Sequence, residues 1–185
     1  MLIVVVGIPG VGKSTVLEAI LRKCPSTTIV NYGDVMVQEA MLSGIDRDTL
    51  QKMPIKKQQE MGKAAAVRIA SEARGVTIVD THACIRTEIG YCPVLPLQVL
   101  EVLQPQALVL ITCSPLLIIK RRERDGKRMR DEENIPELTL YQELAREYLV
   151  ACSTLTGAPL CIVHNDSDAV SHNIRSLVRL IESLS

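Results

Sequence analysis

The sequence contains no tryptophan and no phenylalanine, and only four tyrosines. Proteins that hold single-stranded nucleic acid usually stack its bases on aromatic side chains, so this shortage disfavours nucleic acid as a partner. The charges also balance, with 21 Lys and Arg against 21 Asp and Glu, which leaves no net field to attract DNA or a membrane. The core must be aliphatic, and the hydrophobic fraction of 47% is ample for one.

Cysteine motifs and long apolar runs are absent as well. The six cysteines have neither C-x-x-C nor zinc-finger spacing, which favours reduced thiols in the cytosol. The apolar stretch at residues 1–6 is too short for a signal peptide or a membrane span, and no other apolar run is long enough to cross a bilayer. We therefore expect a soluble, cytoplasmic protein with no membrane partner.

The sequence alternates short apolar runs with longer segments of helical spacing. The runs are continuous and rich in β-branched residues, as is typical of parallel strands covered on both faces. They occupy residues 2–6, 27–30, 76–79, 107–111 and 160–163. Helices are expected at residues 14–23, 34–43, 55–74, 97–103 and 137–156, and from 115 and 168 onwards. The pattern predicts one doubly wound, three-layer α/β/α domain over residues 1–185, with a five-stranded parallel sheet.

The strongest motif follows the first predicted strand. It matches the phosphate-loop pattern G-x-x-x-x-G-K-[ST] and consists of Gly7, Ile8, Pro9, Gly10, Val11, Gly12, Lys13 and Ser14. Glycines let backbone N–H groups wrap a phosphate, and the helix that follows directs its positive end at the anion. We expect this loop to bind ATP with Mg²⁺. Lys13 would reach the β- and γ-phosphates, Ser14 would ligate the metal, and Thr15 would bind the α-phosphate.

A carboxylate, Asp80, closes the third apolar run. In this fold class the end of that strand lies beside the phosphate loop, where an aspartate holds Mg²⁺ directly or through water. The plainer alternative is a helix cap or a turn residue.

An arginine-rich segment, Lys120–Asn134, reads K-R-R-E-R-D-G-K-R-M-R-D-E-E-N. Arginine forks match phosphate oxygens, and Gly126 could act as a hinge, so the segment is predicted to be a lid that closes over ATP. The alternative is a solvated charged loop. The sequence has no N-K-x-D guanine motif and no strong candidate for a base that activates water. These absences favour a kinase over a GTPase switch.

The motifs together resemble those of the nucleoside monophosphate kinases, and in particular the archaeal type of adenylate kinase. Besides the phosphate loop, the resemblance rests on Asn31-Tyr32-Gly33-Asp34, Val79-Asp80-Thr81-His82, Gly90-Tyr91 with Leu95-Pro96, and Arg128-Met129-Arg130-Asp131. These elements occur in the family's order and cover most of the chain.

The resemblance implies the reaction ATP + AMP ⇌ 2 ADP with Mg²⁺ as cofactor, and a homotrimer. It also implies an AMP-binding insert at about 32–62 and a short lid at about 121–134. The implied AMP-site residues are Tyr32, Gly33, Asp34, Arg47, Asp80, His82, Arg86 and Tyr91. The residues implied for phosphoryl transfer are Lys13, Arg86, Arg124, Arg128, Arg130 and Arg146.

Some of these side chains have plainer interpretations. A lone histidine such as His82 is more often structural, so we expect it at most to position its neighbours. Arg86 could be a solvated loop residue. Tyr32 and Tyr91 are expected in loops at strand ends, where they either pack beside the AMP adenine or are buried without ligand.

Two departures from the family pattern bear on the AMP phosphate. Gln51 stands where archaeal relatives usually carry arginine, and Val37 stands where bacterial ones do, so Arg47 or Lys52 would have to substitute. Two other functions therefore stay open. One is a kinase of the same fold acting on another nucleotide or on a hydroxyl acceptor. The other is an ATPase that serves as a switch in RNA or ribosome assembly.

Overall fold

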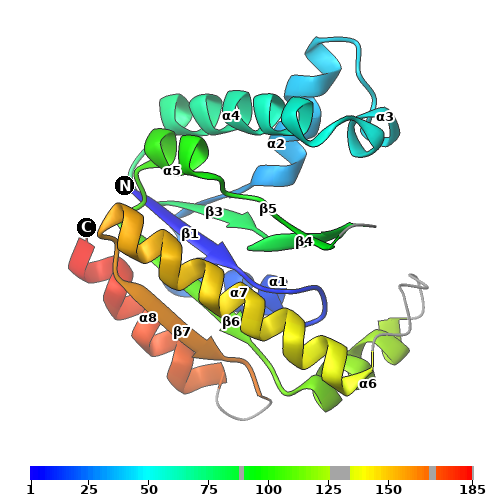
Figure 1. The fold of residues 1–185 in the computed structure, drawn as a ribbon. Helices are drawn as coiled ribbons and strands as arrows, with labels where there is room; N and C mark the ends of the chain where they lie inside the picture. Colours follow the sequence, from blue (N-terminus) through cyan, green and yellow to red (C-terminus); the bar gives the residue numbers. More distant parts are fainter. Residues whose placement is uncertain (88–89, 126–133, 167–169, 185) are drawn as a thin grey trace.

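The computed structural model describes residues 1–87, 90–125, 134–166 and 170–184 (Figure 1). Residues 126–133 of the predicted lid, which include Gly126, Arg128 and Arg130, lie outside these ranges. Among the helices that the structure describes, none combines the length and the apolar character needed to cross a membrane.

A five-stranded parallel sheet forms the centre of the molecule, in the order β2-β3-β1-β6-β7. Its strands are β1 (Leu2–Val6), β2 (Thr28–Asn31), β3 (Thr77–Thr81), β6 (Ala107–Thr112) and β7 (Leu160–His164). Every residue of β1 and β6 is buried, whereas β2 and β7, at the two edges, are partly exposed. The continuous apolar runs are thus those of strands covered on both faces, which confirms the predicted sheet.

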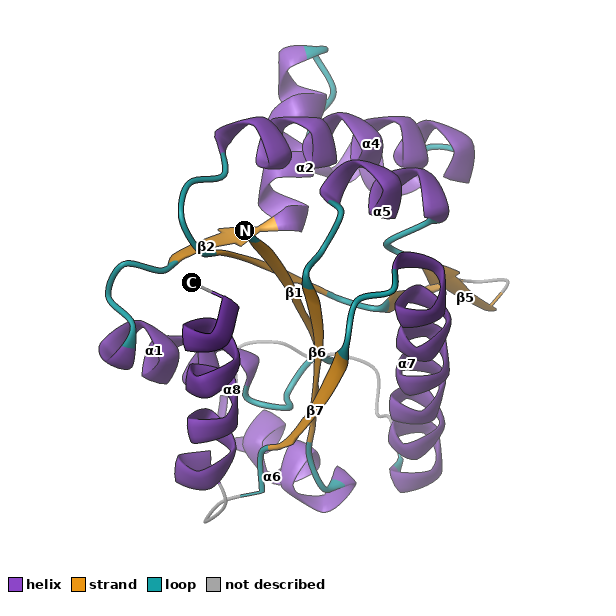
Figure 2. Cartoon of the chain, turned by 90° about the vertical axis from the view of Figure 1, so that its left-hand side faces the viewer, coloured by secondary structure: helices purple, strands orange, loops and turns teal. Residues whose placement is uncertain are grey.

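Helices cover both faces of this sheet. Figure 2 shows α1 and α8 on one side and α5 and α7 on the other, which confirms three layers. The bounds are α1 (Lys13–Lys23), α5 (Leu97–Leu103), α6 (Pro115–Asp125), α7 (Ile135–Thr156) and α8 (Val170–Leu184). Local signals set several helix ends. A capping box of Asn134 and Glu137 begins α7, and Gly157, in the left-handed region, ends it.

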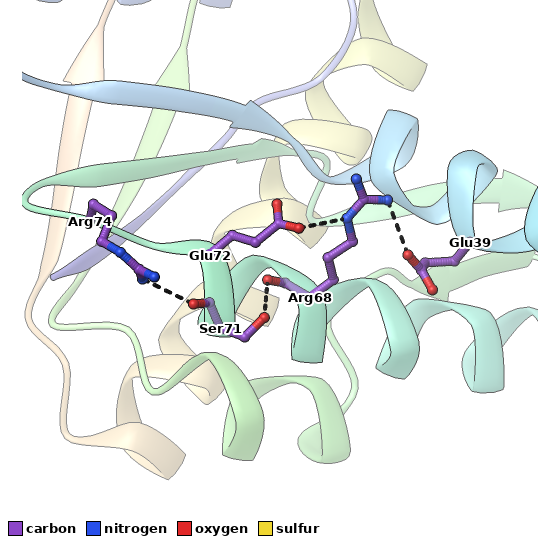
Figure 3. A network of polar contacts seen from close by, with 5 residues as sticks. All are labelled: Glu39, Arg68, Ser71, Glu72 and Arg74. Carbon is purple, nitrogen blue, oxygen red and sulfur yellow. Dashed lines mark hydrogen bonds and ion pairs between the residues drawn. The ribbon is translucent and has the colours of Figure 1, made fainter.

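The remaining helices lie together beyond one edge of the sheet (Figure 1). They are α2 (Tyr32–Leu42), α3 (Arg47–Lys52) and α4 (Ile55–Glu72), and α4 packs against both α2 and α5. Arg68 of α4 joins two of them, because its guanidinium contacts Glu39 of α2 and Glu72 of α4, each at 3.1 Å (Figure 3). Residues 45–62 are helical over most of their length, because α3 and the start of α4 fall within them.

The structure contains a helix, α3, and a hairpin that we did not predict, and some helices, α2 among them, begin about two residues away from the predicted start. Cys84–Thr87 and Gly90–Pro93 form an antiparallel hairpin, β4-β5, where we expected a loop. Strands of four residues are too short to show a reliable alternation. Helix α2 begins at Tyr32 rather than Asp34, because the Asn31 side chain accepts a hydrogen bond from the Asp34 N–H and caps it. The prediction that Tyr32 and Tyr91 lie in loops was wrong for both.

Candidate active site

The candidate site lies at the carboxyl edge of the parallel sheet. Strand register puts Val6 beside Thr81 and Asn31 beside Asp80, so the ends of β1, β2 and β3 meet there. The phosphate loop leaves β1 at this edge and enters α1. In open α/β sheets this is the edge at which ligands bind.

Two apolar side chains of the phosphate loop, Ile8 and Val11, are buried and anchor the loop in the core. Gly12 is the N-cap of α1 and has a φ of 82°, in the left-handed region that favours glycine. A β-carbon built on Gly12 would lie only 2.3 Å from Nδ2 of Asn165. The position therefore requires glycine both for its backbone angle and for space.

Side chains from three distant elements bind the carbonyl oxygens of this loop. Asn165, just after β7, donates from Nδ2 to the Val11 carbonyl at 2.7 Å. Arg121 and Arg122 of α6 donate to the carbonyls of Val11 (3.1 Å) and Pro9 (2.8 Å). His82, just after β3, has Nδ1 2.9 Å from the carbonyl oxygen of Gly7.

These contacts decide which way the loop's donors face. In a trans peptide the C=O and the next N–H point in opposite directions. Holding the carbonyls of Gly7, Pro9 and Val11 therefore turns the N–H groups of the residues that follow them to the other side. A concave set of N–H groups at a helix N-terminus is a phosphate site.

Asn165 is the functional residue that sequence reasoning missed, whereas Arg121 and Arg122 belong to the arginine-rich segment and were expected as lid residues that contact ATP; the structure places both against the carbonyls of the phosphate loop. A signal for the arginines existed in the helix period. Ile118 is buried, with Cγ2 2.9 Å from where a β-carbon of Gly10 would stand, and the arginines follow three and four residues later on the same helix face. Asn165 offered no such signal. Arg124, which we predicted, is exposed near the end of α6.

Lys13 and Asp80 are in direct contact, as expected for a phosphate-loop lysine and a strand-end carboxylate. Lys13 Nζ lies 2.6 Å from Asp80 Oδ1 and donates to the Thr81 carbonyl at 3.1 Å. Their side chains are only 13% and 16% exposed. Asp80 is also contacted by Asn31, whose Nδ2 lies 3.2 Å from Oδ2. Ser14 and Thr15, which follow Lys13 in the first turn of α1, are exposed.

A second, largely apolar pocket lies between α2, α4, the β4-β5 hairpin and α5. It encloses about 70 Å³ and is lined by Tyr32, Met36, Ile55, Gln58, Gln59, Gly62, Ile85, Cys92, Pro93, Val94, Pro96 and Val99. Tyr32 is buried in its wall, and burial raises the pKa of its phenol. Tyr91 is not part of this lining. Its ring packs against Tyr141, with 5.1 Å between the centroids.

Four further predicted residues lie between these two regions or beyond them. Gly33 and Asp34 form the first turn of α2, and Asp34 pairs with Arg47 of α3 at 2.9 Å, on the surface. Arg86 of β4 is about half exposed and has Nη2 3.9 Å from Oε1 of Glu137, at the start of α7. Both arginines are therefore accessible to a ligand.

Arg146 lies elsewhere. It lines a polar pocket of about 290 Å³ between α7 and the ends of β6 and β7, together with Thr112, Ser114, His164 and Asp166. The residues of this pocket do not come from the phosphate loop. A role for Arg146 in phosphoryl transfer stays a prediction, as do the roles of Arg128 and Arg130 outside the described residues.

Close packing in the second pocket gives a stability prediction. A β-carbon on Gly62 of α4 would lie 2.5 Å from the hydroxyl oxygen of Tyr32. We expect Gly62→Ala to lower the free energy of unfolding by roughly 1–3 kcal/mol, because α2 or the tyrosine must shift. Chemical denaturation measures this change.

The control is the same substitution in a Tyr32→Phe background. Without the hydroxyl, the nearest ring atom would be 3.7 Å from the new methyl group, an ordinary contact. Gly62→Ala should then cost much less. An equal cost in both backgrounds would contradict the proposed clash.

Comparisons with known proteins agree with this geometry. A family model described as an AAA domain matches residues 6–139, well over half of the chain. The chain is 40% identical to an adenylate kinase from Methanopyrus kandleri, with 98% of each chain covered. It is 39% identical to an adenylate kinase from Saccharolobus solfataricus, over 95% of this chain and 98% of that one. It is 41% identical to an adenylate kinase from Sulfurisphaera tokodaii, over 88% and 89%.

Among solved structures, a shikimate kinase from Bacteroides thetaiotaomicron is similar in fold. The TM-score is 0.60 with 98% of each chain covered, and the sequences are 15% identical. At that identity the likeness supports the fold alone.

Proposed function

The chain belongs to the adenylate kinase family, and we propose that it catalyses reversible phosphoryl transfer, ATP + AMP ⇌ 2 ADP. One observation carries the proposal. Asn31 contacts Asp80 beside the phosphate loop, and the next residue, Tyr32, already lines the second pocket. The triphosphate loop and a pocket with the largely apolar lining typical of ligand sites thus adjoin at one edge of the sheet.

In this proposal the phosphate loop, Gly7–Thr15, binds ATP. The N–H groups turned inward by His82, Arg122 and Asn165 cradle the phosphates, and Lys13 leaves Asp80 to reach the β- and γ-phosphates. AMP places its adenine in the pocket lined by Tyr32. Arg86 and Arg47, both accessible, bind its phosphate, and Asp34 fixes Arg47. The arginines of the lid, Arg124, Arg128 and Arg130, and Arg146 beyond it, neutralise the charge that spreads during transfer.

We also propose Mg²⁺ as cofactor, held by the Ser14 hydroxyl and the Asp80 carboxylate. The described residues contain no cluster of three or more His, Cys, Asp or Glu. Mg²⁺ characteristically takes one or two protein oxygens and fills its other positions with phosphate oxygens and water. The Ser14 hydroxyl and the Asp80 carboxylate provide the one or two protein oxygens that such a site needs. When bound, the ion would neutralise charge on the phosphates.

A homotrimer in the cytoplasm completes the proposal. The resemblance of the motifs to the archaeal type of the family supports the trimer. The reduced cysteines, with no disulfide among the described residues, are compatible with the cytoplasm. Sedimentation at micromolar concentration measures the assembly.

An acceptor survey tests the activity. ATP and Mg²⁺ are supplied with AMP, CMP, UMP, GMP or no acceptor, and the products are separated by ion-exchange chromatography. We expect ADP in twofold yield with AMP and little hydrolysis without it, because a closed site excludes water. ATP turnover that does not depend on AMP would favour an ATPase switch instead, and turnover with another acceptor would favour a different kinase.

The role of Arg86 gives a kinetic prediction. Arg86→Ala should raise the KM for AMP by roughly tenfold and that for ATP much less, because a charge-assisted contact to the AMP phosphate is lost. Steady-state kinetics with each substrate varied in turn measures both constants. Arg74→Ala is a matched control, since Arg74 is also exposed and donates to the local carbonyls of Ser71 (Figure 3) and Ala73. A larger change in the KM for ATP would move Arg86 to the ATP side.

A further inference from the structure

The last residue of β2, Asn31, makes two bonds with opposite chemistry. Its Oδ1 accepts from the Asp34 N–H at 3.1 Å and caps α2. Its Nδ2 donates to Asp80 Oδ2 at 3.2 Å. Among short side chains only the asparagine amide carries both an acceptor and a donor on one rigid plane. Asn31 thereby connects α2, which lines the second pocket, with the Asp80 carboxylate beside the phosphate loop.

We propose that Asn31 is a positioning residue that holds the Asp80 carboxylate in the orientation the reaction uses. The inference rests on the proposed function, in which Asp80 serves the Mg²⁺ site. Asn31 itself touches neither nucleotide in this proposal.

The register of the sheet explains why Asn31 can do this. Asn31 and Asp80 are direct partners on the parallel strands β2 and β3. Side chains of such partners leave the same face of a sheet, about one strand spacing apart. The short asparagine amide therefore reaches the carboxylate directly, and the capped turn of α2 fixes the amide plane.

The contact matters most when ATP is bound. In the free protein Asp80 has a partner on each oxygen, Lys13 on Oδ1 and Asn31 on Oδ2. When the Lys13 ammonium moves to the phosphates, Oδ1 loses that partner. Asn31 then keeps the carboxylate from rotating, and outer contacts of this kind set how well a carboxylate serves a metal.

A plain helix-capping role is the rival explanation, and two variants separate it from positioning. In Asn31→Ser the hydroxyl still caps α2, since serine is a good N-cap, but it is too short to reach Asp80. Asn31→Ala loses both bonds. We expect both variants to need about tenfold more Mg²⁺ for half-maximal activity. Only Asn31→Ala should also lose thermal stability and raise the KM for AMP.

The experiment is a Mg²⁺ titration of ADP formation, at saturating ATP and AMP, on the full chain. It is run for the wild type, both Asn31 variants, Asp80→Asn, and the double variant Asn31→Ser with Asp80→Asn. If Asn31 acts through Asp80, Asn31→Ser should change the titration several-fold in the wild-type background and hardly at all in the Asp80→Asn background.

The outcomes are distinct. If Asn31→Ser needs the same Mg²⁺ concentration for half-maximal activity as the wild type, and only Asn31→Ala needs more, the positioning role is overturned and helix capping remains. An equal effect of Asn31→Ser in both backgrounds would overturn the path through Asp80. If Asp80→Asn itself leaves the Mg²⁺ titration unchanged, the proposed metal role of Asp80 fails, and the inference about Asn31 fails with it.

Discussion

Replacing Lys13 by alanine is expected to lower kcat/KM for ATP by about 10³-fold, which corresponds to about 4 kcal/mol of transition-state stabilisation. The ammonium already lies 2.6 Å from Asp80 at the mouth of the phosphate loop, in a setting only 13% exposed. There its charge is poorly screened by water and can act strongly on a transferring phosphoryl group. Steady-state kinetics with AMP fixed at saturation measures the change.

A matched control is Lys23→Ala, at the other end of the same helix, α1, and exposed. It removes the same side chain without approaching the loop and should retain full activity. Circular dichroism should show that both variants fold. If Lys13→Ala kept kcat/KM within tenfold of the wild type, the lysine would have no essential contact with the triphosphate.

Gly12→Ala is expected to weaken ATP binding by at least about 10²-fold while AMP still binds. The left-handed backbone angle alone costs an L-residue about 1–2 kcal/mol. The new methyl group would also stand 2.3 Å from Asn165 Nδ2, which is hydrogen bonded to the Val11 carbonyl and buried. The loop must therefore open, and its N–H groups would no longer converge. Calorimetric titration with each nucleotide separately measures the two affinities.

Gly75→Ala provides the control for backbone strain. Gly75 also has a positive φ, of 53°, but a β-carbon there would meet nothing within 4 Å. This variant should lose some stability and keep its affinity for ATP. Equal ATP affinities for Gly12→Ala and the wild type would show that the loop does not bind the phosphates through its backbone.

The elements predicted best from the sequence were those whose signal is local and continuous. The five parallel strands appeared as runs such as Leu2–Val6, in which every residue is buried, and the phosphate loop appeared as a contiguous motif. Asp80 was predicted beside the phosphate loop because parallel strands end at a common edge.

The parts that could not be predicted depend on contacts between distant segments or on short strands. Asn165 lies 154 residues from Val11, and no local pattern marks it as a partner of the loop. The hairpin that carries Arg86 and Tyr91 consists of two strands of four residues, too short for a periodic signal. Tyr91 packs on Tyr141 of α7, a contact between distant segments that sequence spacing could not indicate.

The carbonyl contacts of the phosphate loop also bear on when the ATP site forms during synthesis. The loop's motif is complete by Ser14, yet the Asn165 side chain that holds Val11 and Gly12 comes from the end of the last strand. A nascent chain therefore cannot present the finished loop until residues through Asn165 have left the ribosome and β7 has docked. The segment that is made first therefore reaches its final shape only after β7 has joined the sheet, so nucleotide binding reports that the five-stranded sheet is complete.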